Sequence, residues 1–453
     1  MKIVVVGGGR VGDALVKYLS QEGHDIVVVD SNQAIIENIG VKYDVNCICG
    51  NGAIKEILLA AGANTADIII AATRQDELNI MCCQIGRLLG AKHSIARVRD
   101  PDYVEQLDFM KKKLGISMIF NPEQETASAI AQMLKYPSAN KVEHFAKGRI
   151  GIVEFDVDEN NMLCNRPIRE VAGFFKKPVV ICAILRNDEL IIPTGNTIIE
   201  ARDRLSVAST SVNLAAFFKD LKMFNQRAKS VMIIGGGNTA YYLARQLDEV
   251  GVSVKIIEKN MNRCFELSNL LGTSVNVICG DGSDKQVLDE EGLKSSDAVT
   301  VMTDSDEQNI IISMFCNQAR IRQVICRMTN YSYSSILEEI DMDSVISPHL
   351  VVAQQIIRYA RALSAPAHEC ILTLYKMADE RAEALEFEIP ENFPSVNEKL
   401  RDIKFKKNLL IVGIIRGKQT VIPDGNTELL IGDHIIIVTA DNRFTSVEDI
   451  LEL

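Results

Sequence analysis

Continuously apolar stretches alternate with amphipathic segments along the first part of the chain. MKIVVVG at the N-terminus, HDIVVVD at 24–30, ADIIIAA at 66–72 and the stretch His93–Val98 are apolar at most consecutive positions, and residues 9–19 carry a helical pattern. Consecutive apolar residues, in place of strict alternation, are typical of strands in a parallel sheet covered on both faces. The order of these segments predicts a doubly wound α/β lobe.

The same pattern occurs a second time along the chain. Residues 7–32 align without a gap to 235–260, and ten of the thirty positions in 50–79 are identical in 280–309. Since self-similarity at a fixed offset indicates a duplicated structural unit, the second half should fold as the first does.

A shorter unit follows each long one, and it is repeated as well. IPTGNT at 192–197 recurs as IPDGNT at 422–427, within segments rich in β-branched residues, and the Pro-x-Gly-Asn sequence predicts a hairpin turn. Residues 123–135 and 349–363 have helical periodicity and suggest helices that link the units. We therefore expect four domains, at 1–135, 140–222, 228–362 and 368–453.

Composition excludes several classes of function. The net charge of −11 leaves no basic surface for a nucleic-acid backbone. No apolar run reaches the roughly 18 residues that a membrane span needs. The eleven cysteines show no CxxC or Cys/His spacing suited to zinc, and we expect them to be mostly reduced core residues. These features favour a soluble cytoplasmic protein.

A dinucleotide fingerprint lies at the first strand-to-helix junction. Gly7, Gly9 and Gly12 directly follow the first expected strand and open the helix, in the GxGxxG spacing. In such a loop the glycines allow a tight turn, a close approach of the pyrophosphate and close helix packing. Asp30 ends the second expected strand, where a carboxylate can bind the adenosine ribose. Because no arginine follows it to favour a 2′-phosphate, the pattern favours NAD over NADP.

The second half reproduces the fingerprint with Gly235, Gly237 and Ala240, followed by Glu258. A chance match at two equivalent repeat positions is improbable, although each loop could instead belong to a structural lobe without a ligand. Thr73, with its equivalent Thr303, should end a fourth strand. Arg97, with its equivalent Arg327, is expected at the start or in the middle of a fifth. A plain structural role remains open for these residues.

A catalytic constellation is missing from the sequence. None of the ten tyrosines has a lysine four residues later, the six histidines do not recur at equivalent repeat positions, and there is no P-loop. A dehydrogenase needs a proton donor or acceptor beside the nicotinamide, so a ligand sensor is favoured over an enzyme. Two alternatives stay open: an NAD-dependent oxidoreductase with an unrecognised substrate domain, and a scaffold with degenerate pockets.

The motifs GGGRVG…VVVD, GNG…LLAAGA..ADIIIAAT..DE.N and ARVRDP resemble the RCK (KTN) domains that regulate potassium transport, over residues 1–450. The resemblance implies an α/β protein with two Rossmann-like doubly wound lobes of the RCK N-type, each followed by a small α+β C-lobe. It further implies that NAD(H), with ATP or ADP, binds to a homotetramer peripheral to the inner face of the membrane. There it would regulate a Trk-type potassium-translocating membrane subunit.

The resemblance is carried over residue by residue to two candidate sites. The first consists of Gly7, Gly8, Gly9, Arg10, Val11, Asp30, Gly50, Asn51, Thr73, Arg74 and Arg97. The second consists of Gly235, Gly236, Gly237, Asn238, Thr239, Glu258, Gly280, Asp281, Thr303, Asp304 and Arg327. Asn51 and Ala240 depart from the usual family pattern, which leaves the ligand preference of each site open.

The two sites differ in charge at equivalent positions. Arg10 and Arg74 of the first correspond to Asn238 and Asp304 of the second. If these side chains face their sites, the first should favour the more highly charged ligand, so that ATP competes well with NADH there.

Overall fold

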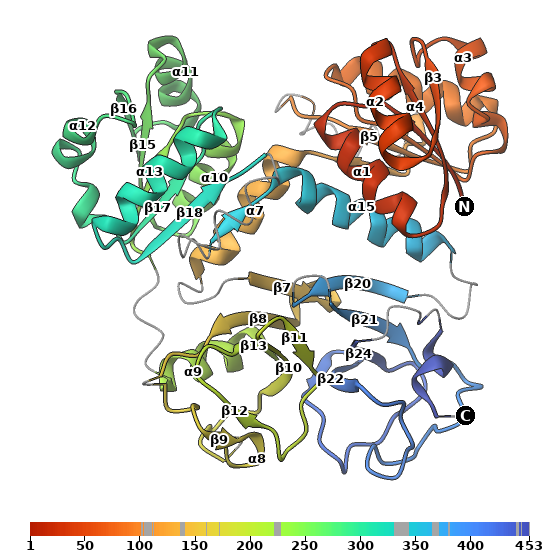
Figure 1. The fold of residues 1–453 in the computed structure, drawn as a ribbon, viewed down its shortest axis with the longest axis vertical. Coiled ribbons are helices and arrows are strands. Elements are labelled where there is room, and N and C mark those ends of the chain that lie inside the picture. The colour runs from red at the N-terminus through yellow and green to blue at the C-terminus, as the bar shows by residue number, and fades with distance from the viewer. Residues whose placement is uncertain are drawn as a thin grey trace. The chain divides into compact units, whose positions relative to one another are not determined.

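The computed structural model describes residues 1–100, 103, 111, 113–135, 141–159, 161–171, 173–221, 228–329, 344–364, 371–378, 381–440, 444 and 446–452. These residues form two compact units (Figure 1). The first unit joins residues 1–131 to 230–360, and the second joins 132–229 to 361–453. Each unit therefore combines corresponding parts of the two sequence repeats.

The first lobe of the first unit is a parallel α/β sheet. Its elements are β1 (Lys2–Val6), α1 (Arg10–Gln21), β2 (Asp25–Asp30), α2 (Gln33–Tyr43), β3 (Asn46–Cys49), α3 (Lys55–Ala60), β4 (Ile68–Ala71), α4 (Asp76–Leu89), β5 (His93–Arg97), β6 (Met118–Phe120) and α7 (Pro122–Lys135). Among the described residues the strand order is β3-β2-β1-β4-β5-β6, and every pairing is parallel. This is the doubly wound order, whose direction reverses between β1 and β4.

The second lobe repeats this architecture. Its elements are β14 (Ser230–Ile234), α10 (Asn238–Glu249), β15 (Ser253–Glu258), α11 (Met261–Leu271), β16 (Val275–Cys279), α12 (Lys285–Glu290), β17 (Ala298–Val301), α13 (Asp306–Gln318), β18 (Gln323–Arg327), β19 (Val345–Ile346) and α15 (Pro348–Ser364). The strand order in the part described is β16-β15-β14-β17-β18-β19. The prediction of two Rossmann-like doubly wound lobes is confirmed.

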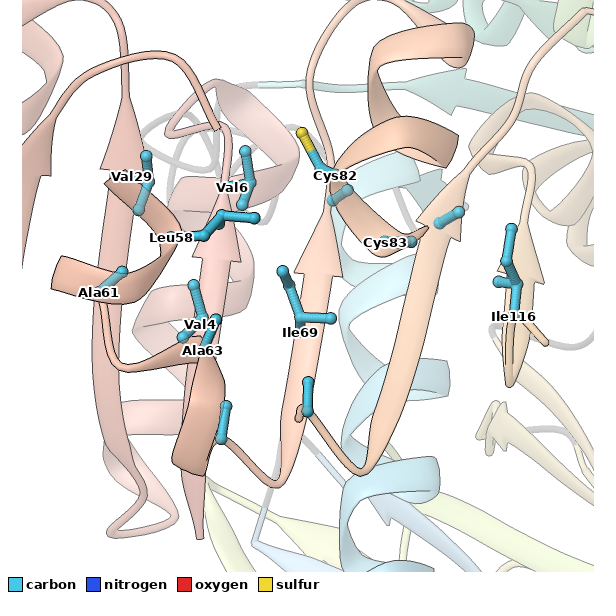
Figure 2. Packing of buried hydrophobic residues seen from close by; sticks show 14 of the residues in the cluster. Val4, Val6, Val29, Leu58, Ala61, Ala63, Ile69, Cys82, Cys83 and Ile116 are labelled. Atoms are coloured by element: carbon cyan, nitrogen blue, oxygen red, sulfur yellow. The ribbon is translucent and has the colours of Figure 1, made fainter. Parts of the chain in front are cut away.

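The apolar runs form the centre of each sheet. Val4 and Val6 of β1 pack with Ile69 of β4, Leu58 of α3 and Cys82 of α4 on one face (Figure 2). These five side chains are at most 2% exposed, as expected for strands covered by helices on both faces. The sheets are rigid frames that hold the loops at their carboxyl ends in fixed positions.

The two short units form antiparallel sheets with few helices. The first comprises β7 (Lys141–Phe145), β8 (Ile150–Asp156), β9 (Arg166–Pro167), α8 (Ile168–Val171), β10 (Val180–Arg186), β11 (Glu189–Ile191), β12 (Ile198–Ile199), β13 (Arg204–Ser209) and α9 (Ser211–Asp220). The second comprises β20 (Ile371–Met377), β21 (Ala382–Glu388), β22 (Leu409–Arg416), β23 (Gln419–Val421) and β24 (His434–Thr439). The expectation of small α+β C-lobes is confirmed.

The hairpin predicted at the Pro-x-Gly-Asn sequence is wrong. β11 pairs with β10 and β12 pairs with β9, so the segment 192–197 connects two sheets. A turn is present at 194–197, where the Thr197 N–H donates to the Thr194 carbonyl oxygen at 3.0 Å, but the hairpin turn lies between β10 and β11, at Asn187 and Asp188, whose φ angles are 48° and 62°. Asn and Asp tolerate this left-handed region and favour such turns, and that signal was present in the sequence.

The linking helices each contact the lobe of the other repeat. In α7, the Ser128 hydroxyl accepts a hydrogen bond from Gln246 of α10 at 3.1 Å. In α15, the Tyr359 hydroxyl lies 3.4 Å from Nδ1 of His93 in β5. The described residues contain no helix that is both long and apolar enough to cross a membrane.

Candidate functional site

The glycine-rich loop after β1 is shaped by positions where a side chain does not fit. Gly7 has a φ of +101°, and a Cβ there would lie 2.9 Å from the backbone of Ala72. Gly235 has a φ of +100°, and its Cβ would lie 2.7 Å from the carbonyl oxygen of Met302. Both features require glycine, and the turn is tight because the loop passes close to the neighbouring strand's end.

The middle glycine of each fingerprint faces open space. A Cβ on Gly9 or Gly237 would meet nothing within 4 Å, so this side of the loop can be approached closely. No side chain caps α1 at Gly9 or α10 at Gly237, whereas Asn32 caps α2 and Asn260 caps α11. Uncapped N–H groups at a helix N-terminus are suited to binding a phosphate.

The residues that follow the fingerprint glycines contribute in two different ways. Val11 and Thr239 are 2% and 3% exposed, so their side chains belong to the core and only their backbone amides are candidates for ligand binding. Arg10 and Asn238, by contrast, are exposed at the helix start. The sequence pattern did not separate these two roles.

The carboxylates at the ends of β2 and β15 anchor the glycine-rich loops. Asp30 accepts hydrogen bonds from the backbone N–H groups of Gly8 at 2.7 Å and Asn32 at 2.8 Å. Glu258 accepts the corresponding bonds from Gly236 and Asn260, both at 2.7 Å. Each carboxylate oxygen keeps a second lone pair for a ligand hydroxyl. Asp30 and Glu258 therefore hold the loops in place, and their role toward a ligand stays a prediction.

The ends of β4 and β5 are joined by a buried asparagine. Asn79, fully buried, accepts from the backbone N–H and the hydroxyl of Thr73, and donates to the carbonyl oxygens of Thr73 and Arg97. Asn309 makes the same four bonds to Thr303 and Arg327. The hydroxyls of both threonines are thus engaged in structure, which supports the structural alternative for them.

Arg97 and Arg327 close their strands, which corrects the expectation that they lie at the start or in the middle. β5 ends at Arg97 and β18 ends at Arg327. The first residues of these strands pair with the first residues of β4 and β17, so both arginines fall at the carboxyl ends of their strands. The carboxyl end of a parallel strand is the edge where a ligand binds in such folds. Both arginines therefore lie on the same edge as the fingerprint loops.

The two repeats differ at the position beside these arginines. Glu123, at the start of α7, lies 3.6 Å from the Arg97 guanidinium, whereas the equivalent position at the start of α15 is His349. Burial lowers the pKa of Arg97 despite Glu123. Nε of Arg97 and of Arg327 is buried and has no hydrogen-bond partner. Unsatisfied buried donors of this kind are suited to an anion.

His349 is affected by the charges of arginines from both lobes. Burial, together with the charges of Arg10 and Arg97 of the first lobe and Arg327 of the second, lowers its pKa to about 4, against the opposing effect of Asp306. Both ring nitrogens are buried without a partner. Arginines that the sequence assigned to separate sites therefore act on the charge of one histidine, which the sequence analysis did not select.

The second crevice contains a cation that the sequence analysis missed. Arg263 of α11 donates to the carbonyl oxygen of Gly236 at 2.8 Å and to the side-chain oxygen of Asn238 at 3.0 Å. It also forms an ion pair with Glu266 at 2.8 Å. The charge difference between the two sites is therefore smaller than the comparison of Arg10 with Asn238 indicated. The equivalent residue of the first half is Ile35, so an alignment of the repeats could have revealed Arg263.

The remaining predicted residues lie on loops at the same edge. Gly50 and Gly280 directly follow β3 and β16, and Asn51 and Asp281 are exposed beside them. Hydrogen bonds from Ser283 lower the pKa of Asp281. Arg74 and Asp304 are exposed and lie three residues after the ends of β4 and β17, and a role in either site stays a prediction.

A pocket of about 400 Å³ lies beside the second crevice and is distinct from it. It is formed by α12, α13 and the loop after β16, and is lined by Gly282, Ser283, Lys285, Leu288, Gln308, Ile311, Ile312 and Phe315. None of the predicted site residues lines it. The loop geometry at the strand ends, and not this hollow, defines the candidate site.

The chain was compared with known protein families. A model of the TrkA-N domain matches residues 3–122 and 231–348, and a model of the TrkA-C domain matches 152–222 and 384–452. The chain is 31% identical over 460 residues to Trk system potassium uptake protein TrkA homolog 1 of Methanosarcina mazei, with 99% of each chain covered. It is 29% identical to Trk system potassium uptake protein TrkA of Halomonas elongata, covering 98% of this chain and 96% of that one.

Solved structures with the same fold include those of the GsuK channel. The GsuK RCK domain gives a TM-score of 0.62 at 19% identity, covering 96% of this chain and 92% of that chain. The GsuK channel bound to NAD gives 0.62 at 19% identity, covering 97% of this chain and 76% of that chain. At these identities the likeness establishes the fold alone.

Proposed function

The chain belongs to the TrkA family of potassium uptake proteins, and from this membership we propose that it is the nucleotide-binding regulatory subunit of a Trk-type potassium uptake system. Its RCK N-lobes would be residues 1–135 and 228–362, and its C-lobes 140–222 and 368–453. The partner would be a potassium-translocating membrane subunit, on whose inner face the chain would sit as a peripheral protein.

The ligand that the first crevice suits best is NAD(H). The observation that carries this proposal is the combination at the β1–α1 loop: an uncapped helix N-terminus, open space at Gly9, and the Asp30 carboxylate fixed beside Gly8. The loop amides would hold the pyrophosphate, and Asp30 would accept from the ribose hydroxyls. GsuK, which shares the fold, has been solved with NAD and with ADP, which agrees with this choice.

ATP or ADP would use the same loop and the arginines near it. Arg10 and Arg97 lie close enough to His349 to lower its pKa, and so does Arg327 of the other lobe. A polyphosphate that extends from Gly9 toward them would meet cations from both lobes. Binding would then favour one arrangement of the lobes, which is the physical basis for coupling nucleotide binding to a membrane partner.

Titration calorimetry with NADH and ATP tests the proposal. Wild-type protein should bind both nucleotides. Gly9→Asp should no longer bind nucleotide at the first crevice, because a carboxylate would occupy the pyrophosphate position. Incubation of NADH with candidate carbonyl substrates serves as the control for an oxidoreductase, and the absorbance of NADH should not change. The proposal fails if neither nucleotide binds, or if NADH is consumed.

A further inference from the structure

Two cysteine side chains lie over consecutive backbone carbonyls at the end of β15, beside the second candidate site. Cys264 lies near the start of α11, and Cys279 is the last residue of β16, in register with Glu258 of β15. The Cys264 Sγ is 3.2 Å from the carbonyl oxygen of Glu258, and the Cys279 Sγ is 3.9 Å from that of Lys259. Since these two carbonyls are consecutive, both sulfurs lie over the same short segment after β15.

The two thiols influence each other and differ in access. Burial, and after it the neighbouring Cys279 thiol, raises the pKa of Cys264. Cys264 is 6% exposed, whereas Cys279 is exposed and neither cysteine is in a disulfide. An accessible thiol beside a shielded one is the arrangement of a reacting and a resolving cysteine.

We propose that Cys264 and Cys279 are a thiol pair that a peroxide oxidises to a disulfide at the second crevice. The Cys279 sulfur attacks one peroxide oxygen, the O–O bond breaks, and the departing hydroxide takes up the thiol proton and leaves as water, giving a sulfenic acid. The Cys264 sulfur then attacks the sulfenic sulfur and water leaves. In total two thiols and one hydrogen peroxide give one disulfide and two waters.

The first lobe lacks this pair. Cys49 corresponds to Cys279 and is likewise exposed, but the position of Cys264 is taken by Ile36, which is 6% exposed in the core. The pair is therefore a property of the second repeat. A disulfide there would join α11 covalently to the end of β16. α11 also carries Arg263, which contacts the phosphate-binding loop at Gly236.

Mass spectrometry of the full-length protein tests the pair directly. Cys264 and Cys279 are the only cysteines of the tryptic peptide 264–285, because no lysine or arginine separates them. After treatment with hydrogen peroxide and alkylation, this peptide should be two hydrogens lighter and unalkylated, and dithiothreitol should reverse both changes. Oxidised Cys279 without the loss of two hydrogens would overturn the proposal.

The variant Cys264→Ser provides a second readout that does not depend on the peptide mass. Without the resolving thiol, the sulfenic acid at Cys279 should accumulate and react with dimedone, while wild type gives little adduct. Circular dichroism checks that the variant is folded, and Cys279→Ser should give no adduct at this site. Equal adduct in wild type and Cys264→Ser would contradict the pairing.

A bound nucleotide should protect the thiol pair from oxidation if the pair lies at the second crevice. This expectation rests on the proposed function. NADH at about ten times its dissociation constant should slow disulfide formation roughly tenfold, since only the free fraction reacts. Gly237→Asp should abolish the protection. If the disulfide forms at the same rate with and without ligand, the second crevice is not the ligand site, whereas the thiol pair itself stands.

Discussion

Asp30 performs two tasks that one substitution would disturb together. Asp30→Ala should weaken NADH binding by about 1.5–3 kcal/mol, through loss of a charge-assisted bond to the ribose. It should also lower the free energy of unfolding, because the Gly8 and Asn32 amides lose their acceptor. Calorimetry and urea unfolding measure the two effects.

Asp30→Glu is the matched control, because Glu258 anchors its own loop with the same pair of bonds. This variant should keep the stability of wild type and change only ligand affinity. Unchanged NADH affinity in Asp30→Ala would remove Asp30 from the ligand site.

His349 should make the protein less stable in acid. Its pKa of about 4 in the folded state lies below the usual 6.5, so the unfolded chain binds the proton more tightly. As pH falls from 6.5 to 4, the free energy of unfolding should therefore decrease, by about 3 kcal/mol in total. His349→Gln should remove this part of the pH dependence, which urea unfolding at a series of pH values will show. Identical pH profiles for both proteins would contradict the buried, arginine-surrounded environment.

Gly9 and Gly237 allow each crevice to be disabled without disturbing the fold, since a Cβ there meets nothing. With Gly237→Asp, the surviving first crevice should prefer ATP over NADH more strongly than the second crevice does with Gly9→Asp. Arg263 makes the expected difference in ATP-to-NADH preference between the two crevices smaller, because it adds a cation to the second loop. Titrations at low and moderate salt measure the preference. Equal preference and equal salt dependence would remove the charge argument.

At the scale of elements, hydrogen bonds from the Asn79 side chain connect the ends of β4 and β5. Asn79→Ala should lower the free energy of unfolding by about 2–4 kcal/mol, because buried N–H and C=O groups lose their partners. Asn309→Ala should have the same effect in the second lobe, and urea unfolding measures both. A loss under about 0.5 kcal/mol, typical of surface substitutions, would show that the bonds are dispensable.

The order and type of the main elements followed from the sequence, and the positions of individual side chains did not. Continuous apolar runs and the glycine spacing indicate buried parallel strands and a phosphate-binding loop, because these depend on local periodicity and backbone conformation. The end of β5 at Arg97 depends on pairing with β4, and the contact of Arg263 with Gly236 depends on how α11 packs. Neither is a local property of the chain.

At the scale of the whole molecule, the repeats are combined in a way that no single repeat shows. Glu154 of β8 accepts a hydrogen bond from the Ala378 amide at 3.0 Å, and Glu386 of β21 accepts from Ala146 at 3.1 Å. The two C-lobes thus hold each other through equivalent carboxylates that are 4% exposed. The sequence shows the equivalence of these residues but not that they cross between lobes.

The assembly expected from the family is a homotetramer. Light scattering across micromolar concentrations should report about four chains per particle, with ligand changing the shape of the particle and not its mass. A stable monomer over that range would contradict the predicted homotetramer.

The most direct test of the regulatory role is potassium uptake in cells that contain a Trk-type membrane subunit but lack their own peripheral subunit. Expression of the wild-type chain should restore uptake, and Gly9→Asp, folded and expressed to the same level, should restore it poorly because the first crevice no longer binds nucleotide. Uptake that is the same with wild type, with Gly9→Asp and without any chain would contradict the account.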